Sequence, residues 1–200
     1  MIVEPKSRGF ICTTAHPAGC AAHVNEQIAY VQNQGPIKSG PKKVLIIGAS
    51  TGYGLASRIA ASFGAGSETI GVFFEKEAKG KRTATAGWYN TVAFEKSAHD
   101  KGLYAKSING DAFSHEIKRQ VIDLIKEDWN GGVDLVIYSL ASPRRKDPDS
   151  DTVYSSCLKT MGAPFVSKSL NLTSKIVETV TIDPATDAER DETIKVMGGD

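Results

Sequence analysis

A strand, a glycine-rich turn and the start of a helix follow one another in the segment Val44-Leu45-Ile46-Ile47-Gly48-Ala49-Ser50-Thr51-Gly52-Tyr53-Gly54-Leu55. Its four consecutive apolar residues, three of them β-branched, are typical of a buried parallel strand. The apolar-periodic run from Leu55 to Phe63 then predicts a helix. Glycine at 48 permits a sharp turn, at 52 the close approach of a ligand, and at 54 tight packing of the helix on the sheet.

The beginning of this helix is a candidate anion site. The first N–H groups of a helix lack intrahelical acceptors, and the positive end of the helix dipole points at the turn. A second apolar run, Ile70 to Phe74, ends at Glu75, near the position about 20 residues on where a ribose-binding acid is expected. We therefore interpret the segment as a dinucleotide-binding site. The alternative is a glycine-rich turn with a structural role only.

Composition restricts the class of protein. The chain has 200 residues, of which 40% are hydrophobic and 24% charged, enough for one domain with a real core. Its formal net charge of +1 gives no electrostatic reason to expect nucleic acid or an anionic membrane surface as partner. No apolar run approaches the ~20 residues that span a bilayer, and the N-terminus lacks the layout of a secretory signal. We therefore expect a cytoplasmic protein that binds neither nucleic acid nor membrane.

Two cysteines and two histidines near the N-terminus are spaced in a way that superficially resembles a Cys2His2 metal site: Cys12, His16, Cys20 and His23. Pro17, however, fits the first turn of a helix that runs to a stop at Gly35. We favour this helix, in which the cysteine and histidine are ordinary helix residues, and predict no metal site. Three cysteines in the whole chain are too few for a disulfide framework, which fits a reducing compartment.

Strand and helix patterns alternate along residues 41–138, which indicates an α/β fold with a doubly wound, Rossmann-like parallel sheet. The predicted strands are 43–47, 69–74, 103–108 and 133–138, and the predicted helices 55–63, 87–102 and 114–130. We interpret residues 1–40 as an N-terminal extension, a short strand and a helix packed on the core, and residues 41–200 as the first half of a dinucleotide-binding domain. After residue 144 the pattern predicts helical turns near 165–170, a strand at 176–182 and a helix starting near 184–187.

Asp111, the loop 76–82 and Tyr53 each have a functional and a structural interpretation, and the end of the strand 133–138 has a functional one. Asp111, after the strand 103–108, could accept a hydrogen bond from an adenine amino group or could be a turn acid. The backbone at Ser139 and Leu140 follows the strand 133–138 and should face the nicotinamide half of a dinucleotide, because the strand order 3-2-1-4 puts it beside the glycine turn. The charged loop 76–82 is either a solvated turn or a basic rim for a phosphate-bearing ligand. Tyr53 could border the nicotinamide pocket or merely pack on the helix.

A hydride-transfer enzyme of this fold needs a proton donor, commonly a Tyr whose hydroxyl is acidified by a nearby Lys. Tyr154 and Lys159 are five residues apart, which would place them on different sides of a helix. We find no suitable pair and only four core strands. The sequence therefore predicts the first half of a longer protein, with no catalytic residue in these 200.

Seven short motifs are distributed over the whole chain: Arg8-Gly9-Phe10-Ile11-Cys12; His16-Pro17 with Gly19-Cys20; Gly48-Ala49-Ser50-Thr51-Gly52-Tyr53-Gly54; Gly87-Trp88-Tyr89-Asn90; Asn109-Gly110-Asp111-Ala112-Phe113; Tyr138-Ser139-Leu140-Ala141-Ser142-Pro143-Arg144-Arg145; and Val196-Met197-Gly198-Gly199. In combination they resemble the N-terminal half of the FabV-type enoyl reductases. This family comprises NADH-dependent enoyl-ACP reductases and trans-2-enoyl-CoA reductases, and is related to the short-chain dehydrogenases/reductases.

The resemblance implies NADH-dependent reduction of the C2–C3 double bond of an enoyl thioester in fatty acid synthesis, with acyl carrier protein or coenzyme A as the carrier. We expect a monomer at full length. The family's catalytic Tyr and Lys, separated by eight residues, would lie beyond residue 200. The implied cofactor residues are Gly48, Ala49, Ser50, Thr51, Gly52 and Tyr53 at the pyrophosphate, Phe74 and Glu75 at the adenosine ribose, Asp111 and Ala112 at the adenine, and Ser139 and Leu140 nearer the nicotinamide.

Glu75 further predicts a preference for NADH over NADPH. Its carboxylate can accept both ribose hydroxyls of NADH, whereas the 2′-phosphate of NADPH would bring like charges together. A competing interpretation is a dinucleotide-binding regulatory module without catalysis. A carbonyl-reducing short-chain dehydrogenase is disfavoured, because the sequence has no Tyr-x3-Lys pair.

Overall fold

The structure is a computed structural model that describes residues 2–9 and 11–199. Phe10, part of the first motif above, therefore lies outside the described residues. The chain divides into two compact units, Met1–Leu140 and Ala141–Asp200. The first unit comprises β1 (Ser7–Arg8), β2 (Ile11–Cys12), α1 (Pro17–Asn33), β3 (Lys43–Ile47), α2 (Gly52–Ile59), the π-helical turn η1 (Ala60–Gly64), β4 (Glu68–Phe73), α3 (Ala86–Asp100), β5 (Ala105–Asn109), α4 (His115–Trp129) and β6 (Leu135–Tyr138). The second comprises β7 (Arg144–Lys146), β8 (Val153–Ser155), β9 (Phe165–Leu170), β10 (Val177–Ile182) and α5 (Asp187–Val196).

A four-stranded parallel sheet forms the centre of the first unit. Its strand order, β5-β4-β3-β6, is the predicted order 3-2-1-4. Ile47 at the end of β3 is in register with Val72 of β4 and Tyr138 of β6. The carboxyl ends of these strands therefore meet at one edge. β4 and β5 extend the sheet on one side of β3, whereas β6 is added on the other side. That switch point is where doubly wound sheets bind their ligands.

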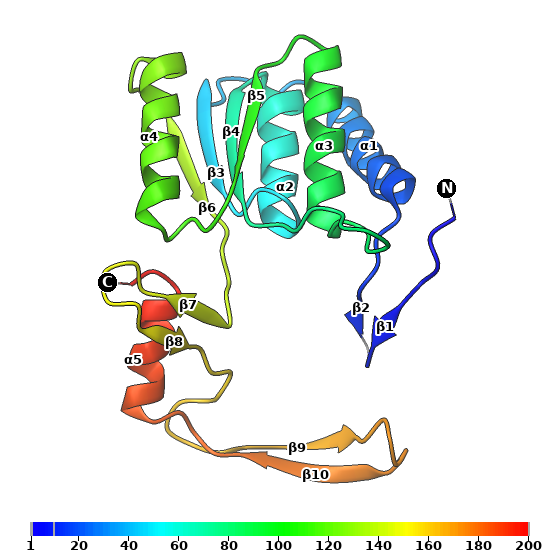
Figure 1. Ribbon diagram of the computed structural model, residues 1–200, viewed down its shortest axis with the longest axis vertical. Coiled ribbons are helices and arrows are strands. Elements are labelled where there is room, and N and C mark those ends of the chain that lie inside the picture. Colours follow the sequence, from blue (N-terminus) through cyan, green and yellow to red (C-terminus); the bar gives the residue numbers. More distant parts are fainter. Residues whose placement is uncertain (1, 10, 200) are drawn as a thin grey trace. The chain divides into compact units, whose positions relative to one another are not determined.

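Both faces of the sheet are covered by helices, as Figure 1 shows, with α1, α2 and α3 on one side and α4 on the other. Alternate residues of β3 point to opposite faces: Leu45 packs with Ile117 and Val121 of α4, whereas Val44 and Ile46 pack with Ala61 of η1. This alternation follows from the period of two in a strand. A strand buried on both faces must be apolar throughout, which is why the run 44–47 predicts it.

The N-terminal helix α1 is part of the core of the first unit. Val24 and Ile28 are buried in one cluster with Leu55 and Ile59 of α2 and Phe94 of α3. The ring of His16 caps the helix, because its Nδ1 accepts the N–H of Gly19 at 3.2 Å. Pro17 is the first helical residue, as predicted, where its missing N–H costs nothing.

One charged side chain is fully buried between α2 and the sheet. Arg58 donates hydrogen bonds to Thr69 Oγ1 at 3.3 Å, Ser107 Oγ at 2.8 Å and the Lys106 carbonyl at 2.7 Å. Its guanidinium also lies 4.4 Å from the ring centroid of Phe94. Burial lowers the pKa of Arg58 to about 10, and the negative charge of Glu95 opposes this shift. The side chain therefore stays charged at neutral pH and joins α2 to both β4 and β5.

The sheet has one apolar edge. β6 pairs with β3 on one side, and its Leu135, Val136 and Tyr138 side chains are about half exposed. Asp134, just before β6, fixes the start of β3 by accepting the N–H groups of Lys42 at 2.8 Å and Lys43 at 2.9 Å. These two bonds lower the pKa of the Asp134 carboxyl below its ordinary value.

The second unit contains two antiparallel strand pairs, β7–β8 and β9–β10, and the helix α5. The prediction of helical turns near 165–170 is wrong, because these residues form β9 and pair with β10 from Phe165↔Ile182 to Leu170↔Val177. Asn171 closes the hairpin, since its Oδ1 accepts the N–H groups of Thr173 and Ser174. A strand that is exposed along its whole length lacks the clear apolar alternation from which strands are recognised.

Candidate functional site

The glycine turn after β3 is tightly packed against β4 and β6. The N–H groups of Gly48 and Ala49 both donate to the Val72 carbonyl, at 2.8 and 2.9 Å. Gly48 has φ +90°, and a Cβ built on it would overlap the Ser139 carbonyl oxygen and lie 3.2 Å from the Leu140 side chain. The structure therefore brings the predicted nicotinamide-side residues, Ser139 and Leu140, directly beside the turn.

The start of α2 has the geometry of an anion site. Gly54 has no room for a Cβ, because the Gly48 carbonyl lies against it, so the helix begins immediately at the turn. Thr51 is the N-cap residue, and its side chain makes no capping hydrogen bond among the described residues. The first hydrogen bond of the helical pattern runs from the Leu55 N–H to the Thr51 carbonyl. The preceding N–H groups, from residues 52 to 54, are the ones that a pyrophosphate at a helix N-terminus uses.

Tyr53 and Phe74 are two exposed aromatic residues among the predicted cofactor positions. Tyr53, the second residue of α2, is 88% exposed, so the alternative that it packs on the helix is not what the structure shows. Phe74, directly after β4, is 77% exposed and precedes Glu75. Two large exposed aromatic side chains, one of them in the first turn of α2, are available to contact a ligand.

Glu75 lies next to the glycine turn and is held by a network of hydrogen bonds. Its Oε1 accepts the hydroxyl of Ser50 at 2.7 Å. Its backbone is fixed by Asn109, whose Oδ1 accepts the Glu75 N–H at 2.9 Å and whose Nδ2 donates to the Glu75 carbonyl at 3.1 Å. The structure thus joins the predicted ribose acid to the predicted pyrophosphate turn.

Asp111 and Ala112 follow β5. The Asp111 carboxylate accepts the N–H of Phe113 at 2.9 Å, and its carbonyl accepts the N–H and the hydroxyl of Ser114. Asp111 therefore stabilises the turn after β5, which is the structural alternative given above. Its hydrogen bond to an adenine amino group stays a prediction. Ala112 lines an apolar pocket of about 230 Å³ between the sheet and α4, with Leu45, Val72 and Ile117 in its wall.

The second unit contains a tyrosine and a lysine in contact that sequence spacing did not reveal. The spacing of Tyr154 and Lys159 was judged for a helix, but Tyr154 lies in β8 and Lys159 in the loop after it. The lysine that contacts Tyr154 is a different one. Lys195 of α5 lies 3.3 Å from the Tyr154 hydroxyl and 4.7 Å from its ring centroid. The two residues are 41 positions apart, so only folding brings them together.

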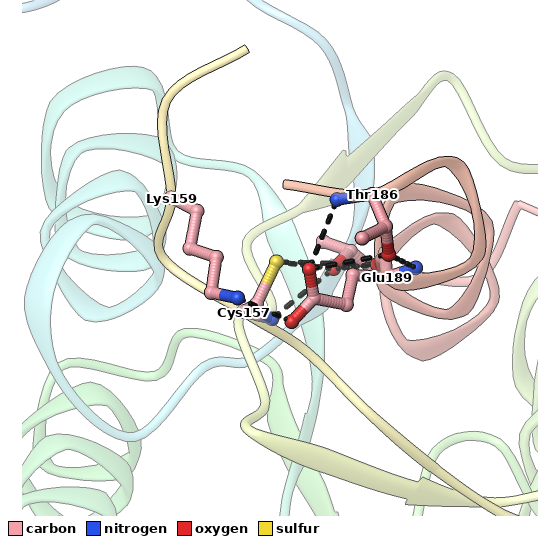
Figure 2. A network of polar contacts seen from close by, with 5 residues as sticks. Cys157, Lys159, Thr186 and Glu189 are labelled. Atoms are coloured by element: carbon pink, nitrogen blue, oxygen red, sulfur yellow. Dashed lines mark hydrogen bonds and ion pairs between the residues drawn. The ribbon is translucent and has the colours of Figure 1, made fainter. Parts of the chain in front are cut away.

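Lys159 has a different partner, which Figure 2 shows. Its Nζ forms an ion pair with Glu189 Oε1 at 2.6 Å, while Glu189 Oε2 accepts the N–H of Thr186 at 2.9 Å in a capping box at the start of α5. The ion pair raises the pKa of Lys159 and lowers that of Glu189. Cys157 joins the same network through its N–H, which donates to Thr193 Oγ1. This network anchors the loop after β8 to α5.

The part of the chain that the structure describes holds no group of three or more His, Cys, Asp or Glu side chains that could bind a metal ion. Cys12 instead lies beside Thr14, whose backbone and side chain lower the pKa of the thiol, whereas burial raises that of Cys20. Among the described residues, none of the helices has the length and apolar character needed to cross a membrane.

A parallel sheet in this strand order, with a glycine turn and a helix N-terminus at its switch point, defines a Rossmann-type nucleotide-binding protein. Two family models match the chain. One, described as the NAD(P)H binding domain of trans-2-enoyl-CoA reductase, covers residues 2–80, and the other, the trans-2-enoyl-CoA reductase catalytic region, covers residues 82–200. The chain belongs to the trans-2-enoyl-CoA reductase family, which confirms the resemblance found in its motifs.

Individual relatives give the same assignment. The chain is 63% identical over 200 residues to an enoyl-[acyl-carrier-protein] reductase [NADH] of Coxiella burnetii, covering 100% of this chain and 49% of the relative. The corresponding protein of Colwellia psychrerythraea is 60% identical over 199 residues, covering 100% of this chain and 50% of the relative. The chain thus spans about half the length of the curated relatives it matches.

Two solved structures are similar over the whole chain. The trans-2-enoyl-CoA reductase of Treponema denticola, in complex with NAD, is 46% identical with a TM-score of 0.88, and 51% of it is covered. That of Clostridium acetobutulicum, in complex with NADH, is 44% identical with a TM-score of 0.89, and 50% of it is covered. All of this chain is aligned in both comparisons.

Sequence reasoning missed the roles of Asn109, Gly87 and Asn90. All three belong to motifs that contribute to the family resemblance. A run such as Gly87-Trp88-Tyr89-Asn90 does not reveal which residues of other segments its side chains will contact. In the structure the Asn90 side chain donates to the Ser50 carbonyl at 3.1 Å, and Trp88 packs edge-on against Phe73. The second contact packs α3 against β4.

Proposed function

We propose that this chain is the NADH-binding part of an enzyme that reduces the C2–C3 double bond of enoyl thioesters. The observation that carries the proposal is the hydrogen bond between Ser50 in the glycine turn and Glu75, two residues after β4, which links the proposed pyrophosphate turn to the proposed ribose-binding acid. The names of the relatives, enoyl-[acyl-carrier-protein] reductase [NADH] and trans-2-enoyl-CoA reductase, support it.

The twelve cofactor residues implied by the resemblance keep their proposed roles. Residues 48–53 bind the pyrophosphate with the first N–H groups of α2, Phe74 and Glu75 bind the adenosine ribose, and Asp111 and Ala112 the adenine. The backbone at Ser139 and Leu140 lies nearer the nicotinamide. NADH, when bound, supplies the hydride that is added to C3 of the thioester. The proton donor is a Tyr assisted by a Lys, both beyond residue 200, and the acyl group is carried by acyl carrier protein or coenzyme A.

A second function is a dinucleotide-binding regulatory module, in which the cleft is kept without catalysis. Both functions fit residues 1–200, since the expected proton donor is what separates them. A Tyr and a Lys separated by eight residues in the sequence that follows residue 200 favours the reductase. We also propose that the protein at its natural length acts in the cytoplasm as a monomer.

The experiment that tests the function is NADH oxidation by the gene product at its natural length, with crotonyl-CoA as substrate and the 200-residue chain measured alongside. We expect turnover by the long form only. Binding of NADH without turnover by either form would contradict the reductase and favour the regulatory module. Failure to bind any dinucleotide would contradict both functions.

A further inference from the structure

The carboxylate of Glu75 lies against the first turn of α3 because residue 87 there is a glycine. A Cβ built on Gly87 would overlap Oε1 of Glu75 and would lie 2.7 Å from the hydroxyl of Ser50. Real Cβ atoms essentially never approach other atoms closer than 3.0 Å. Any side chain at position 87 must therefore displace the Glu75 carboxylate, the Ser50 hydroxyl or both.

The groups around Glu75 are themselves fixed. Ser50 is 6% exposed, and the carbonyl of this residue accepts a hydrogen bond from Asn90, one turn further along α3 and 8% exposed. Asn109 holds the N–H and the carbonyl of Glu75 with both ends of its side-chain amide. The backbones of Glu75 and Ser50 are both held by hydrogen bonds, and the Ser50 hydroxyl donates to the carboxylate, so its orientation is set before a cofactor binds.

We propose that Gly87 and Ser50 are positioning residues for cofactor specificity, which act by fixing the carboxylate of Glu75. This inference rests on the proposed NADH-binding function. It gives Gly87 and Asn90 of the motif Gly87-Trp88-Tyr89-Asn90 a role in positioning Glu75 and Ser50. A carboxylate offers about four lone-pair sites. Ser50 occupies one of them on Oε1, and the held group presents the others, with its negative charge, to the ribose hydroxyls. A carboxylate that is pushed aside no longer binds the diol and no longer repels a 2′-phosphate.

The first test compares Gly87→Ala with Gly19→Ala in the protein at its natural length. Both glycines lie in the first turn of a helix, and neither has a positive φ, but a Cβ on Gly19 would make ordinary contacts of 3.6 Å or more. The readout is the NADH:NADPH ratio of kcat/KM with crotonyl-CoA. We expect Gly87→Ala to lower this ratio about ten-fold or more and Gly19→Ala to leave it within about two-fold.

Ser50→Ala is the second variant, because it removes the Glu75 hydrogen bond without adding an atom. We expect it to lower the same ratio several-fold, whatever its effect on the affinity for both cofactors. An unchanged ratio in both Gly87→Ala and Ser50→Ala would overturn the proposal. If thermal unfolding shows that Gly87→Ala does not fold, the NADH:NADPH ratio of Ser50→Ala alone tests the proposal.

A merely structural role of Gly87 is separated by a double-mutant cycle with Glu75→Ala. If Gly87 acts through the carboxylate, Gly87→Ala changes the ratio in the wild-type background and leaves it unchanged once Glu75 is Ala. An equal change in both backgrounds would overturn the proposal. Should the protein bind dinucleotides without reducing crotonyl-CoA, the same cycle is measured with the dissociation constants of NADH and NADPH, so that failure of the proposed catalysis and of this inference are distinguished.

Discussion

Gly48 and Ser139 meet across the switch point of the sheet, with the Gly48 Cα facing the Ser139 carbonyl so closely that a side chain cannot be inserted. Gly48 also has φ +90°, where L side chains are strained. Two separate constraints therefore require glycine at this position.

Gly48→Ala tests the steric constraint. Gly66→Ala is its matched control, because Gly66 has a positive φ of +66° but nothing within 4 Å of an added Cβ. We expect Gly66→Ala to lower the free energy of unfolding by about 1–2 kcal/mol through backbone strain, and Gly48→Ala by more than about 3 kcal/mol with loss of NADH binding. Urea unfolding and NADH titration of the protein at its natural length measure both. Equal losses for the two variants would show that the Ser139 contact adds nothing.

Tyr154→Phe tests whether the Tyr154–Lys195 contact is catalytic. We expect this variant of the natural-length protein to keep its kcat for crotonyl-CoA within about two-fold, because the proton donor is expected beyond residue 200. A missing general acid costs about 10²–10⁴-fold. A loss of that size in Tyr154→Phe would move the proton donor into this chain and refute our assignment. Lys195→Met, which removes the ammonium group beside the hydroxyl, serves as the companion variant.

Arg58→Met tests the buried cation between α2 and the sheet. The variant removes the donor to Ser107 Oγ and the Lys106 carbonyl, whereas Thr69 Oγ1 keeps Ser62 as a partner, and a buried polar atom left without a partner costs about 1–3 kcal/mol. Relief of the desolvation of the guanidinium offsets part of this cost, so we expect a net loss of about 3 kcal/mol in the free energy of unfolding.

Equilibrium unfolding in urea measures this loss. Arg119→Met, on the exposed side of α4, is the control and should change the free energy of unfolding by less than about 0.5 kcal/mol. An unchanged stability of Arg58→Met would mean that the cost of burying the charge cancels its three hydrogen bonds.

Asp134→Asn tests a pH dependence. The Lys43 and Lys42 N–H groups lower the pKa of the folded carboxyl below the ordinary value of 3.8. The stability that comes from this charge is therefore present above about pH 3.8 and is lost as the pH falls through the folded pKa. We expect Asp134→Asn to lower the Tm at pH 7 and the difference from wild type to shrink at lower pH. Asp123→Asn, at an exposed site on α4, is the control. A difference that is constant from pH 7 to pH 3 would contradict this account.

The chain's local order of elements could be predicted from the sequence because it follows from near-neighbour chemistry. The apolar run 44–47 can be buried on both faces only as an inner parallel strand, and glycines at 48, 52 and 54 permit the turn into α2. The same reasoning gave the order 3-2-1-4, since a doubly wound sheet has few alternatives. It failed at residues 165–170, where a hairpin is fixed by its partner strand rather than by its own pattern.

Only the tertiary structure shows which side chains from distant segments contact one another. Gly87 is one glycine among 19 in the sequence, and only the packing of α3 on the end of β4 shows that its missing Cβ is the space that Glu75 occupies. Tyr154 and Lys195 are joined in the same way across 41 positions. The sequence by itself determined the strand, turn and helix that form an anion site, because those depend on residues within a few positions of each other. The orientation of the carboxylate beside that site depends on contacts between segments, which no local pattern encodes.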